Sequence, residues 1–284
     1  MKALYDVPAP AKLNLFLHIT GRRADGYHLL QSAFMLIDWC DSLHFELRAD
    51  GQISREDLTV ALPPQDLVVR AALALQAATG TRAGAHIGVA KHVPAQAGMG
   101  GGSSDAATCL LALNRLWRLD LPLAKLAQIG LHLGADVPFF LRGRNAWVEG
   151  IGEQITPLAL PAASFVVLKP PEGLDTAQIF AAPTLQRATE SATITGFAAD
   201  PYGFGHNDLQ LVAQSLCPAV TQGLEWLAAA GLAGRMTGSG SAVFAQMPND
   251  AALGVLGEIP GTWRVRKCGN LDVHPLVGWA PSDD

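Results

Sequence analysis

Cysteine is scarce in this chain. Its 284 residues include four cysteines, which are scattered at Cys40, Cys109, Cys217 and Cys268. The absence of a Cys-x-x-Cys pair and of a paired histidine spacing excludes a zinc ribbon and argues against a disulfide framework. Scattered cysteines of this kind are typical of a protein in a reducing compartment.

Long apolar runs and an excess of positive charge are also missing. No stretch approaches the roughly 20 apolar residues that a membrane-spanning helix needs. The first ten residues, MKALYDVPAP, lack the apolar segment of a secretory signal peptide. We therefore expect a cytoplasmic protein without a membrane partner. The net charge of -5 gives no basic surface, so we expect no nucleic-acid partner either.

The length and the order of the predicted elements indicate two domains. A chain of 284 residues exceeds the usual size of one domain and can bury a large core without a metal or a disulfide. Strand pairs mixed with helices favour an α+β fold. A proline-rich segment at 157–161 separates two such regions, so we predict domains at residues 1–158 and 159–284.

Periodicity predicts most of the elements. In residues 13–19 alternation places Leu13, Leu15, Leu17 and Ile19 on one face of a strand. Segments 31–38 and 43–47 look like an antiparallel pair, and a helix is expected at 66–79 with Gly80 after its end. Further strands are expected at 86–92, 146–156, 164–169, 241–247 and 262–268, and further helices at 103–119, 123–133, 176–180, 208–216, 220–230 and 250–256.

A glycine-rich loop at 94–106, PAQAGMGGGSSDA, is the most informative segment. It lies between an expected strand and an expected helix, so its backbone N–H groups and the helix start could surround an anion. Ser103 and Ser104 could cap the helix, contact phosphate or reach a metal. The alternative is a flexible glycine linker capped by serine.

Three known motifs do not fit this loop. A Walker A loop needs a lysine before its serine, and none is present. The dinucleotide fingerprint Gly-x-Gly-x-x-Gly fails because Ser103 follows Gly102. The nucleophile elbow Gly-x-Ser-x-Gly fails because Ser104 and Asp105 follow Ser103.

The loop resembles the second motif of the GHMP small-molecule kinases. The segment APAKLNL at 9–15 resembles their first motif, and TGSGSA at 237–242 resembles their third. The resemblance implies a two-domain α+β fold with ATP and substrate in the cleft between the domains. It also implies ATP binding by the loop residues Pro94, Ala95, Gln96, Ala97, Gly98, Met99, Gly100, Gly101, Gly102, Ser103 and Ser104.

Two further segments, RRADGYH at 22–28 and GADVPFF at 134–140, resemble one branch of this family. That branch phosphorylates the tertiary 2-hydroxyl of methylerythritol in a cytidine diphosphate ester, on the non-mevalonate route to isoprenoid precursors. Two alternatives stay open. One is another GHMP kinase acting on homoserine or a mevalonate derivative, and the other is a non-catalytic nucleotide-binding regulator on the same fold.

Phosphoryl transfer needs charge neutralisation, a positioned hydroxyl and an acceptor for its proton. The resemblance implies that Asp136 is the general base and that Lys12 pairs with it. Taken alone, Asp136 could cap a helix that begins near Pro138, and Lys12 could be a solvated strand residue. Asn14 lies two residues after Lys12, so both side chains share a face of the strand.

The resemblance places a cytosine ring at Tyr27 and His28. An aromatic face can stack on a base while an imidazole bonds its edge. Phe180 is the candidate for the opposite wall, although an aromatic residue in an amphipathic helix also suits a core. The remaining substrate-binding candidates are Asn14, Thr176, Gly238 and Ser239. Thr176 could instead cap its helix, and the glycine turn at 238 could simply permit a tight strand entry.

No cluster of acidic residues and histidines forms a metal cage, so we expect Mg²⁺ to arrive on the phosphates of ATP. Ser104 and Asp105 are the candidate protein oxygens, although an acidic residue also suits the first turn of any helix. Asp66 stands where the family often has asparagine, so no adenine contact is assigned to it. The expected partners are ATP and one small-molecule substrate.

Overall fold

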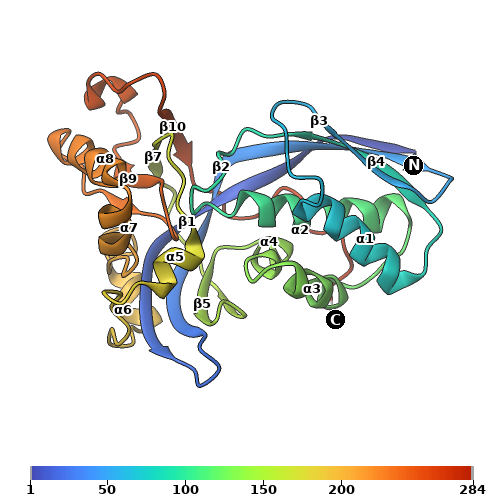
Figure 1. Ribbon diagram of the computed structural model, residues 1–284, viewed down its shortest axis with the longest axis horizontal. Coiled ribbons are helices and arrows are strands. Elements are labelled where there is room, and N and C mark those ends of the chain that lie inside the picture. The colour runs from blue at the N-terminus through green and yellow to red at the C-terminus, as the bar shows by residue number, and fades with distance from the viewer. Residues whose placement is uncertain (1, 283–284) are drawn as a thin grey trace.

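The computed structural model describes residues 2–282, which form two lobes (Figure 1). In the first lobe a six-stranded sheet has the order β3-β4-β2-β5-β6, with β1 paired to β2. Its strands are β1 (Ala3–Arg22), β2 (His28–Arg48), β3 (Ile53–Asp57), β4 (Gly84–Ala90), β5 (Ala146–Gly150) and β6 (Gln154–Pro157). The mixture of strand pairs and helices confirms the predicted α+β class.

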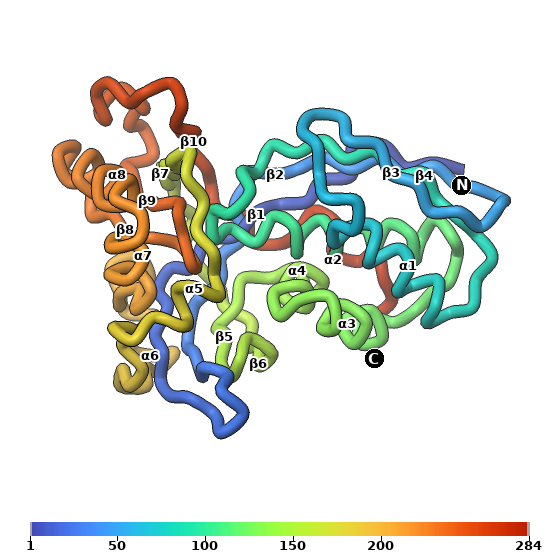
Figure 2. Tube along the Cα trace, viewed as in Figure 1, coloured from blue at the N-terminus to red at the C-terminus, as the bar shows by residue number. Residues whose placement is uncertain are grey.

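β1 and β2 form one long antiparallel hairpin that reaches from the first lobe to the second (Figure 2). Segments 31–38 and 43–47 both belong to β2, so the prediction that they pair with each other is wrong. The polar residues between them stay extended because β1 supplies their partners, as in the pairing of Ala9 with Asp41. The predicted alternation also breaks, because an irregularity between Asn14 and Leu17 turns Leu17 toward the cavity described below.

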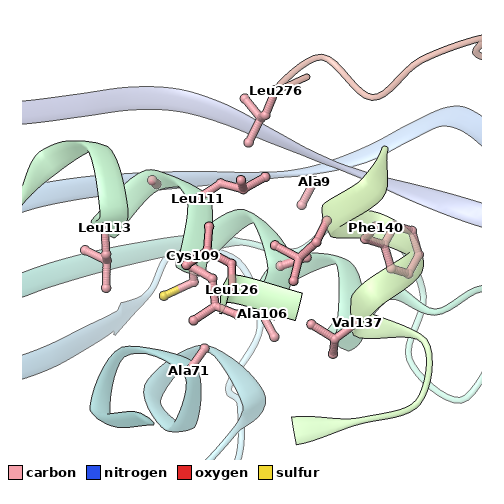
Figure 3. Packing of buried hydrophobic residues seen from close by; sticks show 14 of the residues in the cluster. Ala9, Ala71, Ala106, Cys109, Leu111, Leu113, Leu126, Val137, Phe140 and Leu276 are labelled. Atoms are coloured by element: carbon pink, nitrogen blue, oxygen red, sulfur yellow. The ribbon is translucent and has the colours of Figure 1, made fainter. Parts of the chain in front are cut away.

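Four helices cover one face of this sheet: α1 (Leu67–Thr79), α2 (Gly101–Leu116), α3 (Leu123–Leu133) and α4 (Val137–Arg142). α2 lies at the centre and is buried along most of its length. Its small side chains, such as Ala106 and Cys109, allow close packing against Ala71 of α1 and Val137 of α4 (Figure 3). This packing fixes the start of α2, and therefore the glycine loop, relative to the sheet.

The second lobe is a four-stranded antiparallel sheet in the order β10-β7-β9-β8, with helices beside it. Its strands are β7 (Ser164–Lys169), β8 (Arg235–Met236), β9 (Val243–Met247) and β10 (Arg264–Gly269). Its helices are α5 (Thr176–Ala181), α6 (Ile194–Ala199), α7 (Gln210–Leu216) and α8 (Pro218–Ala229), with a short 3-10 helix at Leu253–Leu256.

The chain after β10 returns to the first lobe. The His274 N–H donates to the carbonyl of Gly143 at 2.8 Å, and Leu276 joins the core around α2 (Figure 3). The guanidinium of Arg115 lies 4.8 Å from the ring centre of Trp279. The predicted division into 1–158 and 159–284 therefore stays a prediction, and its second part contains a tail that packs on the first lobe.

The element predictions succeed where periodicity is strong. The helix at 66–79 is confirmed with Asp66 and Gly80 as its caps, and α3 and β7 have the predicted bounds. The predicted strand 146–156 is a hairpin of β5 and β6, and 250–256 contains only a 3-10 turn. The short elements β3, β8, α4 and α6 have too few residues for a periodic signal. Among residues 2–282 no helix is both long and apolar enough to cross a bilayer.

Candidate active site

A cavity of about 800 Å³ lies between the two lobes. Its walls come from β1, the loop before α2, the start of α4, α5 and the turn before β9. The lining includes ten consecutive loop residues from Pro94 to Ser103, together with Lys12, Asn14, Asp136, Thr176, Phe180, Gly238 and Ser239. Three motifs that are far apart in the sequence therefore meet in one place.

The glycine loop ends directly in α2. Gly100 has φ of 68° in the left-handed region, which glycine adopts without strain, and it precedes the first helical residue. A Cβ at this position would lie 3.0 Å from the ring of Phe140 and 3.3 Å from Cε of Lys12. The first N–H groups of a helix lack intrahelical partners and carry a partial positive charge. The structure thus places a helix start, whose N–H groups suit an anion, on the cavity wall.

Backbone hydrogen bonds hold this loop against β1 and the third motif. The Lys12 N–H donates to the Met99 carbonyl at 3.0 Å, and the Ser241 N–H donates to the Gln96 carbonyl at 3.2 Å. A Cβ on Gly98 would lie 2.1 Å from the carbonyl oxygen of Thr237, so only glycine fits there. The loop is therefore a fixed part of the wall, and the alternative of a flexible linker does not fit.

Lys12 and Asp136 lie next to each other on the cavity wall. The Lys12 Nζ atom lies 3.7 Å from Oδ2 of Asp136 and also donates a hydrogen bond to Oδ1 of Asn14. Lys12 is only 4% exposed, and burial lowers the pKa of its ammonium while the Asp136 charge opposes that shift. Asp136 occupies the cap position of α4, but its carboxylate makes no capping bond. The carboxylate thus remains available inside the cavity.

Asn14 is fixed by partners from two other segments. Its N–H donates to Oγ1 of Thr237 at 2.9 Å, and its side-chain amide donates to Oγ of Ser32 at 2.9 Å. The Thr237 hydroxyl in turn donates to the Gly98 carbonyl at 3.2 Å. Thr237 therefore connects all three motifs. Its place in the third motif was the only signal for this role in the sequence.

A second charged group lies under the loop. The Lys91 Nζ atom forms ion pairs with Asp41 and Asp105, and it lies 2.6 Å from Oδ2 of Asp105. Burial and the neighbouring charge of Asp41 raise the pKa of Asp105, although the charge of Lys91 opposes this shift. Oδ1 of Asp105 is buried without a hydrogen-bond partner, and Asp105 lines the cavity. Sequence reasoning missed Lys91. Its only signal in the sequence is its position just before the glycine loop.

Ser104 does not take the place that the sequence suggested. Its side chain is buried, and its hydroxyl donates to the Pro10 carbonyl at 2.6 Å. It lies in the first turn of α2 on the side that faces β1, and the cavity lining includes Ser103 and Asp105 but not Ser104. Ser104 thus ties α2 to β1, and the structure does not support its predicted contact with ATP or Mg²⁺.

The wall in the second lobe consists of α5 and the turn before β9. Asp175 caps α5 by accepting from the Ala177 N–H, so the alternative that Thr176 is the cap is wrong. The Thr176 hydroxyl lies 2.7 Å from the Ser239 hydroxyl, and both line the cavity. Phe180 is half-buried, lines the cavity and also packs against the core of the second lobe, so the binding role and the core role both stay open.

The cytosine-binding candidates lie at the edge of the site. The rings of His28 and Phe180 are 5.2 Å apart between centres, with 34° between their planes. Tyr27 is 61% exposed on the turn between β1 and β2, and neither Tyr27 nor His28 lines the cavity. The structure brings His28 to Phe180, while stacking of Tyr27 on a base stays a prediction.

Asp66 lies at the opposite end of the cavity, beside Leu62 and Leu67. Its carboxylate accepts from the Val69 N–H and forms an ion pair with Arg55 at 2.6 Å. The carboxylate is thus occupied by the cap and the ion pair. The apolar neighbours could cover a flat ring.

Comparison with known proteins agrees with this geometry. Residues 66–144 match the family model of the GHMP kinases N terminal domain, and residues 192–260 match that of the GHMP kinases C terminal. A relative from Variovorax paradoxus named 4-diphosphocytidyl-2-C-methyl-D-erythritol kinase is 69% identical over 99% of this chain and 100% of its own length. A relative of the same name from Albidiferax ferrireducens is 68% identical over 100% of this chain and 98% of its own.

Solved structures give the same result. A 4-(cytidine 5'-diphospho)-2C-methyl-D-erythritol kinase superposes with a TM-score of 0.78 and 31% identity, covering 93% of this chain and 98% of that one. A homoserine kinase from Cytophaga hutchinsonii shares the fold with a TM-score of 0.68 at 15% identity, covering 96% of each chain. The chain therefore belongs to the GHMP kinases and, within them, to the 4-diphosphocytidyl-2-C-methyl-D-erythritol kinases.

Proposed function

We propose that the chain transfers the γ-phosphoryl group of ATP to the 2-hydroxyl of 4-diphosphocytidyl-2-C-methyl-D-erythritol. The products are the 2-phosphate and ADP, in the non-mevalonate synthesis of isoprenoid precursors. One observation carries this proposal: Lys12 and Asp136, 3.7 Å apart, share a cavity with a glycine loop that opens into a helix start. That arrangement combines an anion cradle with a carboxylate and an ammonium.

The transfer step depends on positioning and electrostatics, because a phosphoryl group passes through a loose transition state. The N–H groups at the start of α2 hold phosphate oxygens. Asp136 accepts the proton of the substrate hydroxyl, and with little nucleophile bonding this proton moves late. Lys12 is held beside Asp136 by Asn14 and orients the hydroxyl.

Mg²⁺ fits the cavity as a companion of ATP. Among the described residues no group of three His, Cys, Asp or Glu side chains could hold a metal by itself. Asp105 offers a buried carboxylate oxygen without a partner, where two carboxylates share the single charge of Lys91. Asp105 would therefore hold the ion together with ATP phosphates, and the bound ion would neutralise charge on those phosphates.

One end of the cavity suits the adenine ring of ATP, and the other end suits the cytosine of the substrate. The apolar residues Leu62 and Leu67 lie beyond the start of α2 and would cover the adenine ring. His28 and Phe180 lie at the other end, where the cytosine would bind. Thr176 and Ser239 lie between that end and Lys12, and their hydroxyls would contact the diphosphate of the substrate.

The test is transfer of labelled γ-phosphate from ATP by purified protein. We expect label in 4-diphosphocytidyl-2-C-methyl-D-erythritol and little in homoserine or mevalonate at equal concentration. Preferred labelling of either rival alcohol would assign the chain to another kinase activity. Binding of ATP without transfer to any of the three would instead indicate a nucleotide-binding regulator.

A further inference from the structure

Arg187 connects the two parts of the cytosine-binding end. Its Nε–H donates to Nε2 of His28 at 3.1 Å, across 159 positions in the sequence. Its terminal nitrogens donate to backbone carbonyls at the end of α5 and just after it, at Phe180, Ala182, Pro183 and Leu185. One guanidinium therefore holds the His28 ring and the segment that carries Phe180.

This hydrogen bond determines where the His28 proton lies. A guanidinium is always a donor and never an acceptor, so Nε2 of His28 must supply its lone pair. The proton of the neutral ring is then on Nδ1, which has no hydrogen-bond partner within residues 2–282. Protonating Nε2 would break the bond and place a second positive charge against Arg187.

The charges around His28 favour the same neutral form of its ring as the hydrogen bond from Arg187. The groups that face the His28 ring are Arg187, Arg22 and the ring of Phe180. Partial burial lowers the pKa of His28, and the charges of Arg187 and Arg22 lower it further. The imidazole is therefore neutral at neutral pH. This agrees with the hydrogen bond from Arg187, which leaves Nδ1 as the only N–H donor of the ring.

We propose that Arg187 is a specificity-determining positioning residue, which fixes His28 as an Nδ1–H donor and thereby selects cytosine over uracil. Cytosine has a bare acceptor nitrogen at N3, whereas uracil has an N–H donor there. A histidine whose Nδ1–H points outward can donate to N3 of cytosine. With uracil the same N–H would face the N3–H group, so two donors would oppose each other. This inference rests on the proposed function, because the base is the cytosine of the proposed substrate.

The first experiment observes the tautomer directly. In protein labelled with ¹⁵N-histidine, long-range proton–nitrogen spectra distinguish Nδ1–H from Nε2–H, and His28→Asn identifies the signal. We expect Nδ1–H at His28 in the wild type. His44 is an internal reference for the opposite tautomer, because its Nδ1 accepts from the Asp6 N–H at 3.0 Å. An Nε2–H signal for His28 would overturn the proposal.

The second experiment measures specificity. The wild type should use the cytidine diphosphate ester in preference to its uridine analogue, and Arg187→Met should reduce the ratio of their kcat/KM values about tenfold. Arg48→Met is the matched control, since Arg48 lies at the far end of β2, bonds Asp50 and Ser54, and should leave the ratio unchanged.

The outcomes separate this inference from the proposed function. If the wild type phosphorylates neither ester, the proposed function fails, while the spectra still decide the tautomer. If the wild type phosphorylates the cytidine ester but Arg187→Met retains the full cytosine preference, the specificity role of Arg187 is wrong. An equal loss of activity toward both esters would indicate that Arg187 only stabilises the structure.

Discussion

The two ends of the cavity are built differently. At the transfer end Lys12 is almost fully buried, and backbone hydrogen bonds connect β1, the glycine loop and the turn before β9. At the base end Tyr27 is exposed and His28 is held by one side chain, that of Arg187. The proposed reacting groups thus depend on main-chain contacts, whereas the proposed base-binding residues depend on contacts between side chains. Substitutions at the two ends should therefore have different kinetic signatures.

The largest effect is expected at the transfer end. Asp136→Asn removes the proton acceptor but keeps the shape of the side chain, so turnover should fall by a factor of about 100 or more. Binding of a fluorescent ATP analogue should change little, because the proposed role of Asp136 is to accept the proton of the substrate hydroxyl and not to bind ATP. Single-turnover transfer measures the first quantity, and a binding titration measures the second. Unchanged turnover would remove Asp136 from its role as base.

The next effect tests the backbone contact of the glycine loop. Gly98→Ala places a Cβ 2.1 Å from the Thr237 carbonyl oxygen and strains a residue with φ of 71°. Gly231→Ala is a matched control, because Gly231 has φ of 74° and open space around its Cβ position. The control should lower the free energy of unfolding by about 1 kcal/mol, and Gly98→Ala by about 2 kcal/mol more. Urea unfolding measures both free energies of unfolding. Equal losses in the two variants would mean that the loop moves to accommodate the Cβ without an energetic cost.

A titration outside the cavity separates stability from function. Burial lowers the pKa of His274 to about 4, and its Nε2 has no hydrogen-bond partner. The unfolded chain takes up a proton near pH 6.5, so stability should fall as the pH decreases from 6.5 toward 4.

His274→Asn removes this titration, and its side-chain oxygen can still accept from the Leu276 N–H as Nδ1 does. Between pH 7 and pH 5 the free energy of unfolding should fall by about 1–2 kcal/mol more in the wild type than in His274→Asn. Unfolding curves at both pH values measure the difference. Parallel losses would show that His274 does not cause the acid sensitivity.

The smallest effect is expected at the exposed base end. Tyr27→Ala should raise KM for the cytidine substrate about fivefold by removing one stacking face, with KM for ATP unchanged. Tyr5 is equally exposed but lies in the first lobe against Glu46, so Tyr5→Ala should leave both constants unchanged. An equal rise in both KM values for Tyr27→Ala would argue against stacking on the base.

Sequence reasoning could predict features that depend on local pattern. Asp66 and Gly80 bound a periodic segment, and the motifs predict that Lys12, Asp136 and the glycine loop share one site, as the cavity lining shows. It could not predict contacts that only the tertiary fold determines. β2 stays extended through its polar middle because β1 lies alongside, and Ser104 turns away because Pro10 offers a carbonyl.

The base end was the least predictable part. Arg187 reaches His28 across 159 positions, and nothing in the residues around Arg187 indicates that contact. The stacking partners could be named from the family resemblance, but the group that orients the imidazole could not. Lys91 and Asp41 were missed for the same reason, because their ion pair joins segments that periodicity treats separately.

The path of the chain between the lobes limits how the enzyme can open. β1 and β2 run through both lobes, the segment before β7 enters the second lobe, and the tail after β10 leaves it again. No single flexible linker joins two independent bodies, so neither lobe should survive cleavage at residue 158 as a folded fragment. Ligands must then enter through rearrangements at the rim of the cavity rather than through a wide separation of its walls.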